Sequence, residues 1–444
     1  MSKSFHRGER QFSPITGLAA QKTMVSSKNP TTVIPGKTPE SRSEDEEPPD
    51  PGRVSTRTPS RRSTPNQTLT SNSSPELLIV PAAERTAIPL APGLGTLERR
   101  AVRRAGRLPF ELAEVDVVVL FTRTTTSKRW DAQELLADEE NAQVARLIAE
   151  VLEPHTRSIQ LRACRRDVEA CLRDLDPARH LIFNLYEGQV GRTGDEVAAA
   201  RYLQERGFIH TGAPYAALAR TCNKWTTKKI VAAAGLPTPA YVIIRKPEEW
   251  QGQLSAPLIV KPIAEEGSIG ITQSSLARTA QDVRPLIEAS LAKYRQALIV
   301  EEFVTGREIN AALWGNHTPQ LLPIAEIAFT WTDDPLQQFV TYASKWISDS
   351  PEYTGTPGIC PARLSARDRK AIERVATGAW RELRLSGYAR VDIRLRDGIP
   401  YILEVNGNPD LAPDAGFFRS AAAAGFNWEG MIQHIAQLAL DSQR

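Results

Sequence analysis

Residues 390–406 read Arg390-Val-Asp392-Ile-Arg-Leu-Arg-Asp397-Gly398-Ile-Pro-Tyr-Ile-Leu-Glu404-Val-Asn406, which is two strand-like runs on either side of an Asp-Gly turn signal. Side chains two apart on a strand share a face, so Glu404 and Asn406 point the same way. An odd-length loop, such as a three-residue loop that ends in a left-handed glycine, would also bring Asp392 onto that face, whereas a two-residue loop would separate it. We therefore expect a hairpin with an odd-length loop.

This hairpin predicts a magnesium site. Mg²⁺ prefers hard oxygen ligands in octahedral geometry and is usually held by one or two carboxylates together with nucleotide phosphates. Asp392, Glu404 and the amide oxygen of Asn406 are ligands of this kind. The alternative is a solvated polar face on an antiparallel strand pair, and the segment alone does not decide between the two.

Composition indicates an ordinary multidomain chain. Its 444 residues are 41% hydrophobic and 24% charged, which favours two or three domains, and the net charge of +3 gives no basic stripe for nucleic acid. The four cysteines are far apart, without a paired motif, which favours reduced thiols in a cytoplasm. No apolar run approaches the length of a membrane span, so we expect no membrane association.

The first 108 residues differ in kind from the rest. Ser, Thr and Pro dominate residues 1–108, and residues 44–47 form an acidic cluster. Such a composition buries too little apolar surface to offset the entropy of ordering, so we interpret this segment as a disordered tail. A transit peptide is the alternative, but the acidic cluster argues against it because transit peptides contain few acidic residues.

Alternating strand and helix signals follow the tail. Residues 117–121 form a continuous apolar run typical of a buried parallel strand, and residues 131–151 carry helical spacing. Residues 180–185 predict the next buried strand, and residues 197–206 a helix. This alternation indicates an α/β layer.

A second unit carries a phosphate-loop signal. We expect a helix over residues 224–234, followed by strands over 240–244 and 257–261. Lys261 ends the last strand, and the small residues Gly267-Ser268-Ile-Gly270 follow it, which suits backbone and hydroxyl contacts to phosphate oxygens. An ordinary turn would look the same.

A further pair of strands is predicted over residues 297–304 and 306–310. An extended segment with apolar neighbours can offer an amide and a carbonyl to an adenine ring. A charged edge strand is the equally good alternative for this segment in isolation.

Taken in order, these motifs resemble the ATP-grasp superfamily, and within it the D-alanine–D-alanine ligase branch, over roughly residues 183–438. The order is Lys224, then Lys261-Pro with the glycine loop, then Glu301-x-Phe-Val with Glu308, then Arg390-x-Asp392 and Glu404-x-Asn406. The resemblance implies an α/β fold of three subdomains after the tail. Their expected limits are 109–219 for the amino-terminal α/β domain, 220–302 for the central lid, and 303–444 for the carboxyl-terminal domain with the metal site.

The resemblance also implies a role for each matching residue. ATP phosphates would be contacted by Lys224, Lys261 and the loop of Gly267, Ser268 and Gly270. The adenine pocket would be lined by Glu301, Phe303 and Val304, with Glu308 at the ribose. Two Mg²⁺ ions, with Mn²⁺ as the alternative, would be held by Asp392, Glu404 and Asn406. The residues implied in catalysis are Arg390, Lys345 and Ser268.

The activity that the resemblance implies is ATP-dependent joining of a carboxylate to an amine through an acyl phosphate. The expected partners are small carboxylate and amine substrates, and the resemblance adds a homodimer. The alternatives are a D-alanine–D-alanine ligase of cell-wall synthesis and a nucleotide-binding regulatory protein without turnover.

The chain departs from the ligases at the substrate end. The loop after the first strand, residues 122–130, replaces a Gly-Gly loop, and Glu187 replaces a histidine. Lys345 resembles the lysine on the family's flexible loop, and Trp346 replaces the tyrosine that follows that lysine. Asp410 and Asp414 follow the last motif, where the ligases bind substrate through a serine and a leucine. Glu187, Asp410 and Asp414 are therefore candidates for binding a cationic group, against the alternative of a helix cap or a loop hydrogen bond.

Overall fold

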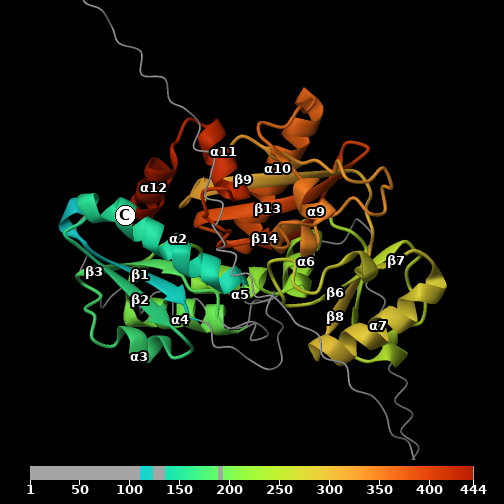
Figure 1. Ribbon diagram of the computed structural model, residues 1–444, viewed down its shortest axis with the longest axis horizontal. Helices are drawn as coiled ribbons and strands as arrows, with labels where there is room; N and C mark the ends of the chain where they lie inside the picture. The colour runs from blue at the N-terminus through green and yellow to red at the C-terminus, as the bar shows by residue number, and fades with distance from the viewer. Residues whose placement is uncertain (1–110, 124–135, 189–193, 444) are drawn as a thin grey trace, which may run out of the picture. The chain divides into compact units, whose positions relative to one another are not determined.

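A computed structural model describes residues 111–123, 136–188 and 194–443 (Figure 1). The predicted tail and most of the loop that follows the first strand lie outside these described ranges.

The amino-terminal sheet is parallel, as expected for an α/β layer. Val117 and Val119 of its central strand belong to one apolar cluster, while Val118 and Leu120 belong to another, so both faces of the sheet are covered. Helices α2 and α12 lie on one face, and α3 and α4 contribute to the other. The strand order is β2-β1-β3-β4, and the elements are β1 Asp116–Thr122, β2 Ser158–Cys164, β3 His180–Leu185, β4 Ile209–His210, α2 Leu136–Leu152, α3 Val168–Leu172, α4 Asp195–Arg206 and α12 Trp428–Asp441.

The central sheet is a small antiparallel layer with one helix on it. Alternation places Val260 and Val300 in an apolar cluster with helix α7, and it places Lys261 and Glu301 on the opposite face. The strand order is β5-β8-β6-β7, and the elements are β5 Tyr241–Ile244, β6 Leu258–Pro262, β7 Leu276–Ala277, β8 Leu298–Glu302 and α7 Ala280–Tyr294.

The carboxyl-terminal sheet is antiparallel and holds the predicted hairpin at one edge. Its apolar face, which includes Ile309, Val391 and Ile393, packs against helices α5, α6 and α10. The strand order is β12-β11-β9-β13-β14, with β10 paired to β9. The elements are β9 Arg307–Gly315, β10 Gln320–Leu321, β11 Ala325–Ile327, β12 Gly358–Ile359, β13 Gly387–Arg396, β14 Ile399–Asn406, α5 Tyr215–Thr221, α6 Lys224–Ala233, α8 Ala343–Trp346, α9 Pro351–Thr354, α10 Ala366–Leu383 and α11 Gly416–Ala423. Short 3₁₀ turns lie at η1 Leu112–Glu114, η2 Glu153–His155, η3 Pro247–Glu249 and η4 Gln273–Ser275.

The loop of the β13–β14 hairpin has two residues, so our expectation of an odd-length loop is wrong. Arg396 pairs with Ile399, which leaves only Asp397 and Gly398 between the strands. Both have positive φ, 54° and 75°, as in the type I′ turn, whose twist matches that of the flanking strands.

A β-bulge in the same hairpin nevertheless brings the two carboxylates together. Regular pairing from a two-residue loop would place Asp392 opposite Leu403. The register shifts between Asp392 and Ile393 and skips Leu403, so Asp392 pairs with Glu404. The shared face that we expected is therefore present, and the bulge produces it.

The domain limits stay predictions. Helix α6, which we expected in the lid, contacts α10 and β14, and its Val231 belongs to the apolar cluster of the carboxyl-terminal sheet. The apolar cluster of the central sheet contains residues from Ile244 to Val300 only, apart from the partly buried Val242.

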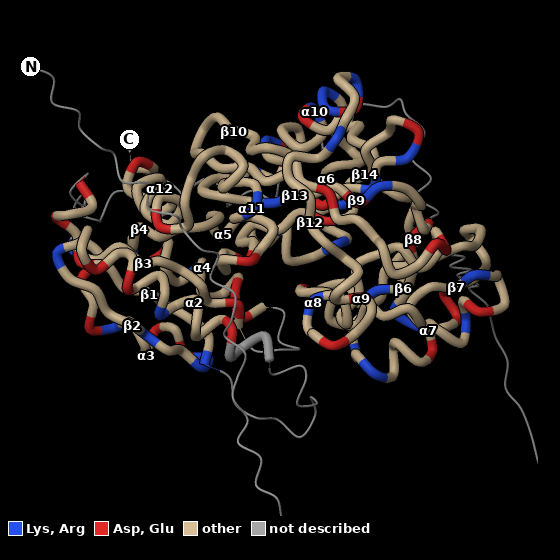
Figure 2. Tube along the Cα trace, turned by 45° about the horizontal axis from the view of Figure 1, so that its top comes forward, with Lys and Arg blue, Asp and Glu red and all other residues tan. Residues whose placement is uncertain are grey.

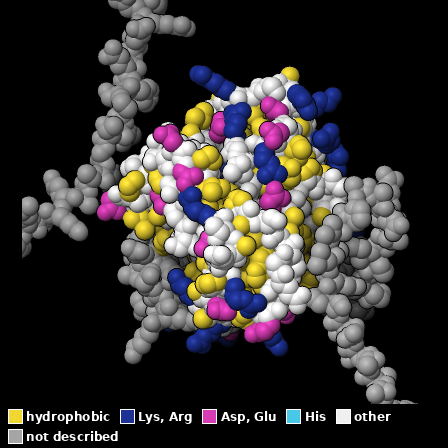
Figure 3. Space-filling view, turned by 90° about the vertical axis from the view of Figure 1, so that its right-hand side faces the viewer, with side chains coloured by type: hydrophobic (Ala, Val, Ile, Leu, Met, Phe, Trp, Pro, Cys, Tyr) yellow, Lys and Arg dark blue, Asp and Glu magenta, His cyan; other side chains and the backbone are white. Residues whose placement is uncertain are grey.

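Charged residues of both signs are mixed over the described chain. Figure 2 shows Lys and Arg interspersed with Asp and Glu along the trace, and Figure 3 shows the same mixture on one face of the molecule. Among the described helices, none combines the length and the apolarity that a bilayer span requires. The four cysteines are free thiols.

Candidate functional site

Asp392 lies at the centre of the polar face of the carboxyl-terminal sheet. Strand β13 lies between β9 and β14, so Asn310 and Glu404 are the residues opposite Asp392. Its carboxylate accepts two hydrogen bonds from the Arg390 guanidinium, 2.7 and 2.9 Å long, and one each from the amides of Asn310 (2.8 Å) and Asn406 (3.0 Å). The two-pronged bond fixes Arg390 beside the predicted metal ligands.

The ligand set on this face fits a magnesium ion. Asp392 and Glu404 supply carboxylates, and Asn406 donates through its amide nitrogen, so its amide oxygen takes no part in that bond. These are hard oxygen ligands of the kind that Mg²⁺ prefers. Asp392 accepts four hydrogen bonds in this structure, so holding a cation would replace some of them.

Glu404 lies among cations that come from four elements. The Lys224 ammonium, at the first residue of α6, is 3.8 Å from the Glu404 carboxylate. Burial would raise the pKa of Glu404, but four neighbouring charges outweigh burial and lower this pKa to about 2. These charges belong to Lys224, Lys345, Lys261 and Arg390. Glu404 is therefore ionised at neutral pH, and positive charge gathers where the predicted ligands meet.

A buried ion-pair network adjoins these cations. The Glu301 carboxylate is 2.9 Å from the Lys228 ammonium and 3.3 Å from that of Lys261. Burial would raise the pKa of Glu301, but the two lysines outweigh it and hold this pKa below its usual value. Our sequence analysis missed Lys228, although its spacing of four residues from Lys224 on a helix places both on one face.

The glycine loop meets the segment that carries Lys345. Gly267, Ser268 and Gly270 have positive φ values of 61°, 63° and 80°, and Ser268 takes this conformation without being glycine, which is typical of functional loops. The Trp346 indole nitrogen donates to the Gly267 carbonyl (3.0 Å). The glycine loop and the segment that carries Lys345 are thus joined by a direct hydrogen bond.

Aromatic and aliphatic side chains form the predicted adenine pocket. Phe303 and Val304 are buried, and the Phe339 ring packs edge-on against Phe303 at 5.4 Å. The Glu308 carboxylate is 2.8 Å from the Arg394 guanidinium. Burial raises the pKa of Glu308, and Arg394 opposes the shift.

These groups line one cavity of about 640 Å³. This volume lies within the range of roughly 300–1,000 Å³ that is typical of small-molecule sites. Every predicted site residue except Lys224 and Gly270 lines this cavity. Lys224 approaches the cavity through its ion pair with Glu404.

The predicted substrate residues line the same cavity. Glu187, Asp410, Asp414 and Trp346 all line it. One Asp410 oxygen accepts a hydrogen bond from the Ala412 amide (2.8 Å), so the loop hydrogen bond that we set against a substrate role is present.

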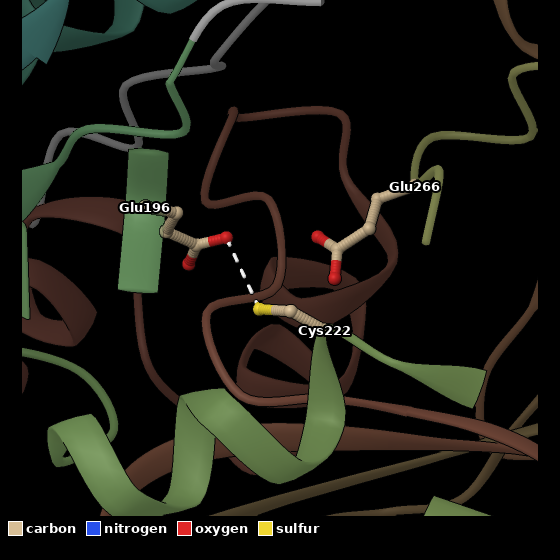
Figure 4. Close-up of side chains that lie close together, drawn as sticks. All are labelled: Glu196, Cys222 and Glu266. Carbon is tan, nitrogen blue, oxygen red and sulfur yellow. Dashed lines mark hydrogen bonds between the residues drawn. The ribbon is translucent and has the colours of Figure 1, made fainter. Parts of the chain in front are cut away.

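Further acidic residues that our sequence analysis missed lie around a cysteine of the same cavity. Figure 4 shows the carboxylates of Glu196 and Glu266 pointing toward each other on either side of Cys222. The Cys222 thiol donates to Glu196 (3.5 Å), and the Asn408 amide donates to its other oxygen (2.9 Å). Burial, with the charges of Glu266 and Glu187, raises the pKa of Glu196 well above its usual value. Only the packing of distant segments brings these groups together.

Comparisons with known proteins relate this chain to a family of ligases. Residues 230–437 match the family described as D-ala D-ala ligase C-terminus. A D-alanine–D-alanine ligase from Methylibium petroleiphilum is 32% identical over 263 residues, which are 57% of this chain and 78% of that protein. An uncharacterised protein from Sinorhizobium fredii is 30% identical over 260 residues, which are 58% of this chain and 74% of that protein.

A solved structure shares the fold. The crystal structure of D-alanine–D-alanine ligase from Bacillus anthracis complexed with ATP covers 74% of this chain and 98% of its own, with a TM-score of 0.57 and 18% identity. With the ordered motifs and the relatives above, this likeness identifies the architecture as the three-subdomain ATP-grasp α/β fold. The chain therefore belongs to the D-alanine–D-alanine ligase family of the ATP-grasp superfamily, and it is an ATP-dependent carbon–nitrogen ligase.

Proposed function

We propose that this ligase activates a small carboxylate as an acyl phosphate and joins it to an amine, with magnesium held by Asp392, Glu404 and Asn406. The observation that supports this most strongly is the group of four cations around Glu404, of which Lys261, Lys345 and Arg390 line the same cavity as Glu404. A fixed positive cluster beside hard oxygen ligands suits a triphosphate and its metal ions, because both the phosphates and the reacting carboxylate are anionic.

The chain's own residues would bind and orient ATP. Lys224, Lys261 and Lys345 would pair with phosphate oxygens, and the backbone amides and the Ser268 hydroxyl of the glycine loop would donate to them. The buried aromatic pair of Phe303 and Phe339 supplies an apolar wall for the base. When bound, Mg²⁺ or Mn²⁺ would neutralise phosphate charge and align the triphosphate.

The proposed reaction has two steps. A carboxylate oxygen attacks the γ-phosphorus, forming an acyl phosphate while the bond to the bridging oxygen breaks and ADP leaves. The amine nitrogen then attacks the acyl carbon and the amide bond forms. Inorganic phosphate leaves with the mixed-anhydride oxygen and takes up the proton that the amine nitrogen loses. Arg390 would stabilise the negative charge of the carboxylate and of the tetrahedral intermediate, which suits a guanidinium held in place by Asp392.

D-alanine is one candidate substrate, because relatives carry the name D-alanine–D-alanine ligase. The residues that replace the ligases' substrate-binding residues, including Asp410 and Asp414, favour a different amine or carboxylate. A homodimer and a cytoplasmic location stay predictions.

The test is release of phosphate from ATP by the full chain with Mg²⁺, screened against pooled carboxylates and amines that include D-alanine and L-amino acids. We expect release that requires both a carboxylate and an amine. Arg390→Met should abolish release, whereas Arg374→Met, an exposed arginine on α10, should not change it. Binding of ATP without release under any pool would instead support the regulatory alternative.

A further inference from the structure

We infer that one substrate of this ligase is a basic amino acid whose cationic side chain is bound by an acidic triad. The acidic triad consists of Glu140, Asp410 and Asp414. Asn184 would bind an oxygen atom of the same substrate. All four residues line the cavity described above. The inference rests on the proposed function, since it assigns a substrate class to the same cavity.

Helix α2 begins at the carboxyl ends of the central strands of the parallel sheet. The Asn141 amide nitrogen donates to the Leu185 carbonyl (3.0 Å), and its oxygen accepts from the Thr122 amide (3.3 Å). Glu140 precedes Asn141, and Asn184 precedes Leu185 in the chain. The first member of the acidic triad and the amide of Asn184 therefore lie on segments that are bonded to each other.

The loop after β14 packs against the same helix. Leu411 and Val144 belong to one apolar cluster, and both line the cavity. Glu140 is one helical turn before Val144, and Asp410 directly precedes Leu411. This packing brings Glu140 and Asp410 to the same part of the cavity, where the charges of Asp410 and Asp414 both act on Glu140.

The acidic triad has no direct ion-pair partner in the described part of the chain. Burial raises the pKa of Asp410, and the charges of Arg390 and Lys345 oppose this shift without outweighing it. No described lysine or arginine forms an ion pair with Glu140, Asp410 or Asp414, and Arg390 is held by the Asp392 carboxylate. Burial, with the charges of Asp410 and Asp414, raises the pKa of Glu140 to about 7. A substrate ammonium or guanidinium would supply the missing positive charge.

Asn184 points to a second feature of the substrate. Its side chain is 1% exposed, and its oxygen accepts a hydrogen bond from the Tyr186 amide (3.2 Å). Its amide nitrogen has no hydrogen-bond partner among residues 111–123, 136–188 and 194–443. A buried donor without a partner is costly, and a carboxylate or carbonyl oxygen of the substrate would satisfy it. A cation and an oxygen acceptor on one molecule favour a basic amino acid over a diamine.

The test compares matched substrates with the full chain, ATP and Mg²⁺. Phosphate release is measured with lysine and with norleucine, whose side chain has a similar length but no charge. Each amino acid is supplied as its D and its L enantiomer, and a pool of compounds supplies the second substrate. Ornithine, arginine and 1,4-diaminobutane are parallel arms. We expect kcat/KM for the preferred basic amino acid to exceed that for norleucine by at least about tenfold, as loss of one charged contact would predict.

Two variants on one helix separate binding from folding. Glu140→Gln should raise KM for the basic amino acid on the order of tenfold with little change in kcat. Glu150→Gln, an exposed position on the same helix, should change neither value. Asn184→Ala should raise KM for lysine and leave that for 1,4-diaminobutane unchanged.

Failure of this inference is distinct from failure of the proposed function. Suppose that phosphate is released equally well with lysine and norleucine, and that Glu140→Gln has no effect. This result would contradict binding of a cationic side chain by the acidic triad, while the proposed ligase activity would stand. Absence of release with every carboxylate and amine would overturn the proposed function itself.

Discussion

Replacing Lys228 with methionine should destabilise the protein, because it breaks a fully buried ion pair. Lys228 is 0% exposed and Glu301 is 1% exposed, and their charged atoms are 2.9 Å apart. Removing one partner of such a pair typically costs about 3–5 kcal/mol, since the other charge stays buried without it. Glu301 would keep Lys261 at 3.3 Å, so we expect the lower end, about 3 kcal/mol.

The assay is urea unfolding of the nucleotide-free protein at pH 7, followed by tryptophan fluorescence. Lys229→Met is the matched control, because Lys229 is the next residue of the same helix and is exposed. It should change the free energy of unfolding by less than about 0.5 kcal/mol. The double variant with Lys228→Met and Glu301→Gln should lose less free energy of unfolding than the sum of the losses in the two single variants. The reason is that each single change already removes the same interaction.

The reasoning would be refuted by a loss below about 1 kcal/mol in Lys228→Met together with strict additivity in the double variant. That result would mean that Lys261 alone satisfies Glu301. It would also mean that the bonds from Lys228 to Thr238 and to the Ile402 carbonyl contribute little.

Three further predictions follow from the site and the parallel sheet. Glu404→Ala should lose magnesium-dependent phosphate release while the protein stays folded, and retention of full activity would contradict the metal assignment. Trp346→Phe removes the bond to the Gly267 carbonyl and should weaken ATP binding by a few-fold, about 1 kcal/mol, in calorimetry; an unchanged Kd would contradict the role of that bond. Hydrogen bonds from Arg157 and Ser158, together with the charge of Arg179, hold the pKa of Asp116 well below its usual value of 3.8. The contribution of Asp116 to stability is therefore present above pH 4 and is lost as pH falls further. Asp116→Asn should therefore cost about 1–2 kcal/mol at pH 7 in urea unfolding, and this difference should shrink below pH 4; a constant difference would contradict the linkage.

Local patterns in the sequence were sufficient to place several strands and a helix, some of which carry the proposed nucleotide and metal ligands. The apolar run at residues 117–121 predicted a buried parallel strand, and the structure has β1 there with both faces covered. Helix α6 and strands β3, β5, β6 and β8 also lie where periodicity placed them, within a few residues. Periodicity works here because the alternation of buried and exposed positions is a property of each segment alone.

The register of the hairpin could not be obtained in this way. The bulge that skips Leu403 decides that Asp392 faces Glu404, and it depends on how β14 packs against β13 and the helices beneath. The Asp-Gly pair favours the two-residue turn that the structure has, but that turn alone would have placed Asp392 opposite Leu403.

By itself, the sequence of this chain determined its element types, the order of its motifs and, through that order, its family. Only the tertiary structure decided that Lys228 pairs with Glu301 and that Glu140 lines the same cavity as Asp410. These pairs join segments that are 73 and 270 positions apart, as their residue numbers show. Their charges and burial depend on which distant surfaces meet, and neither spacing nor periodicity along the chain carries that information.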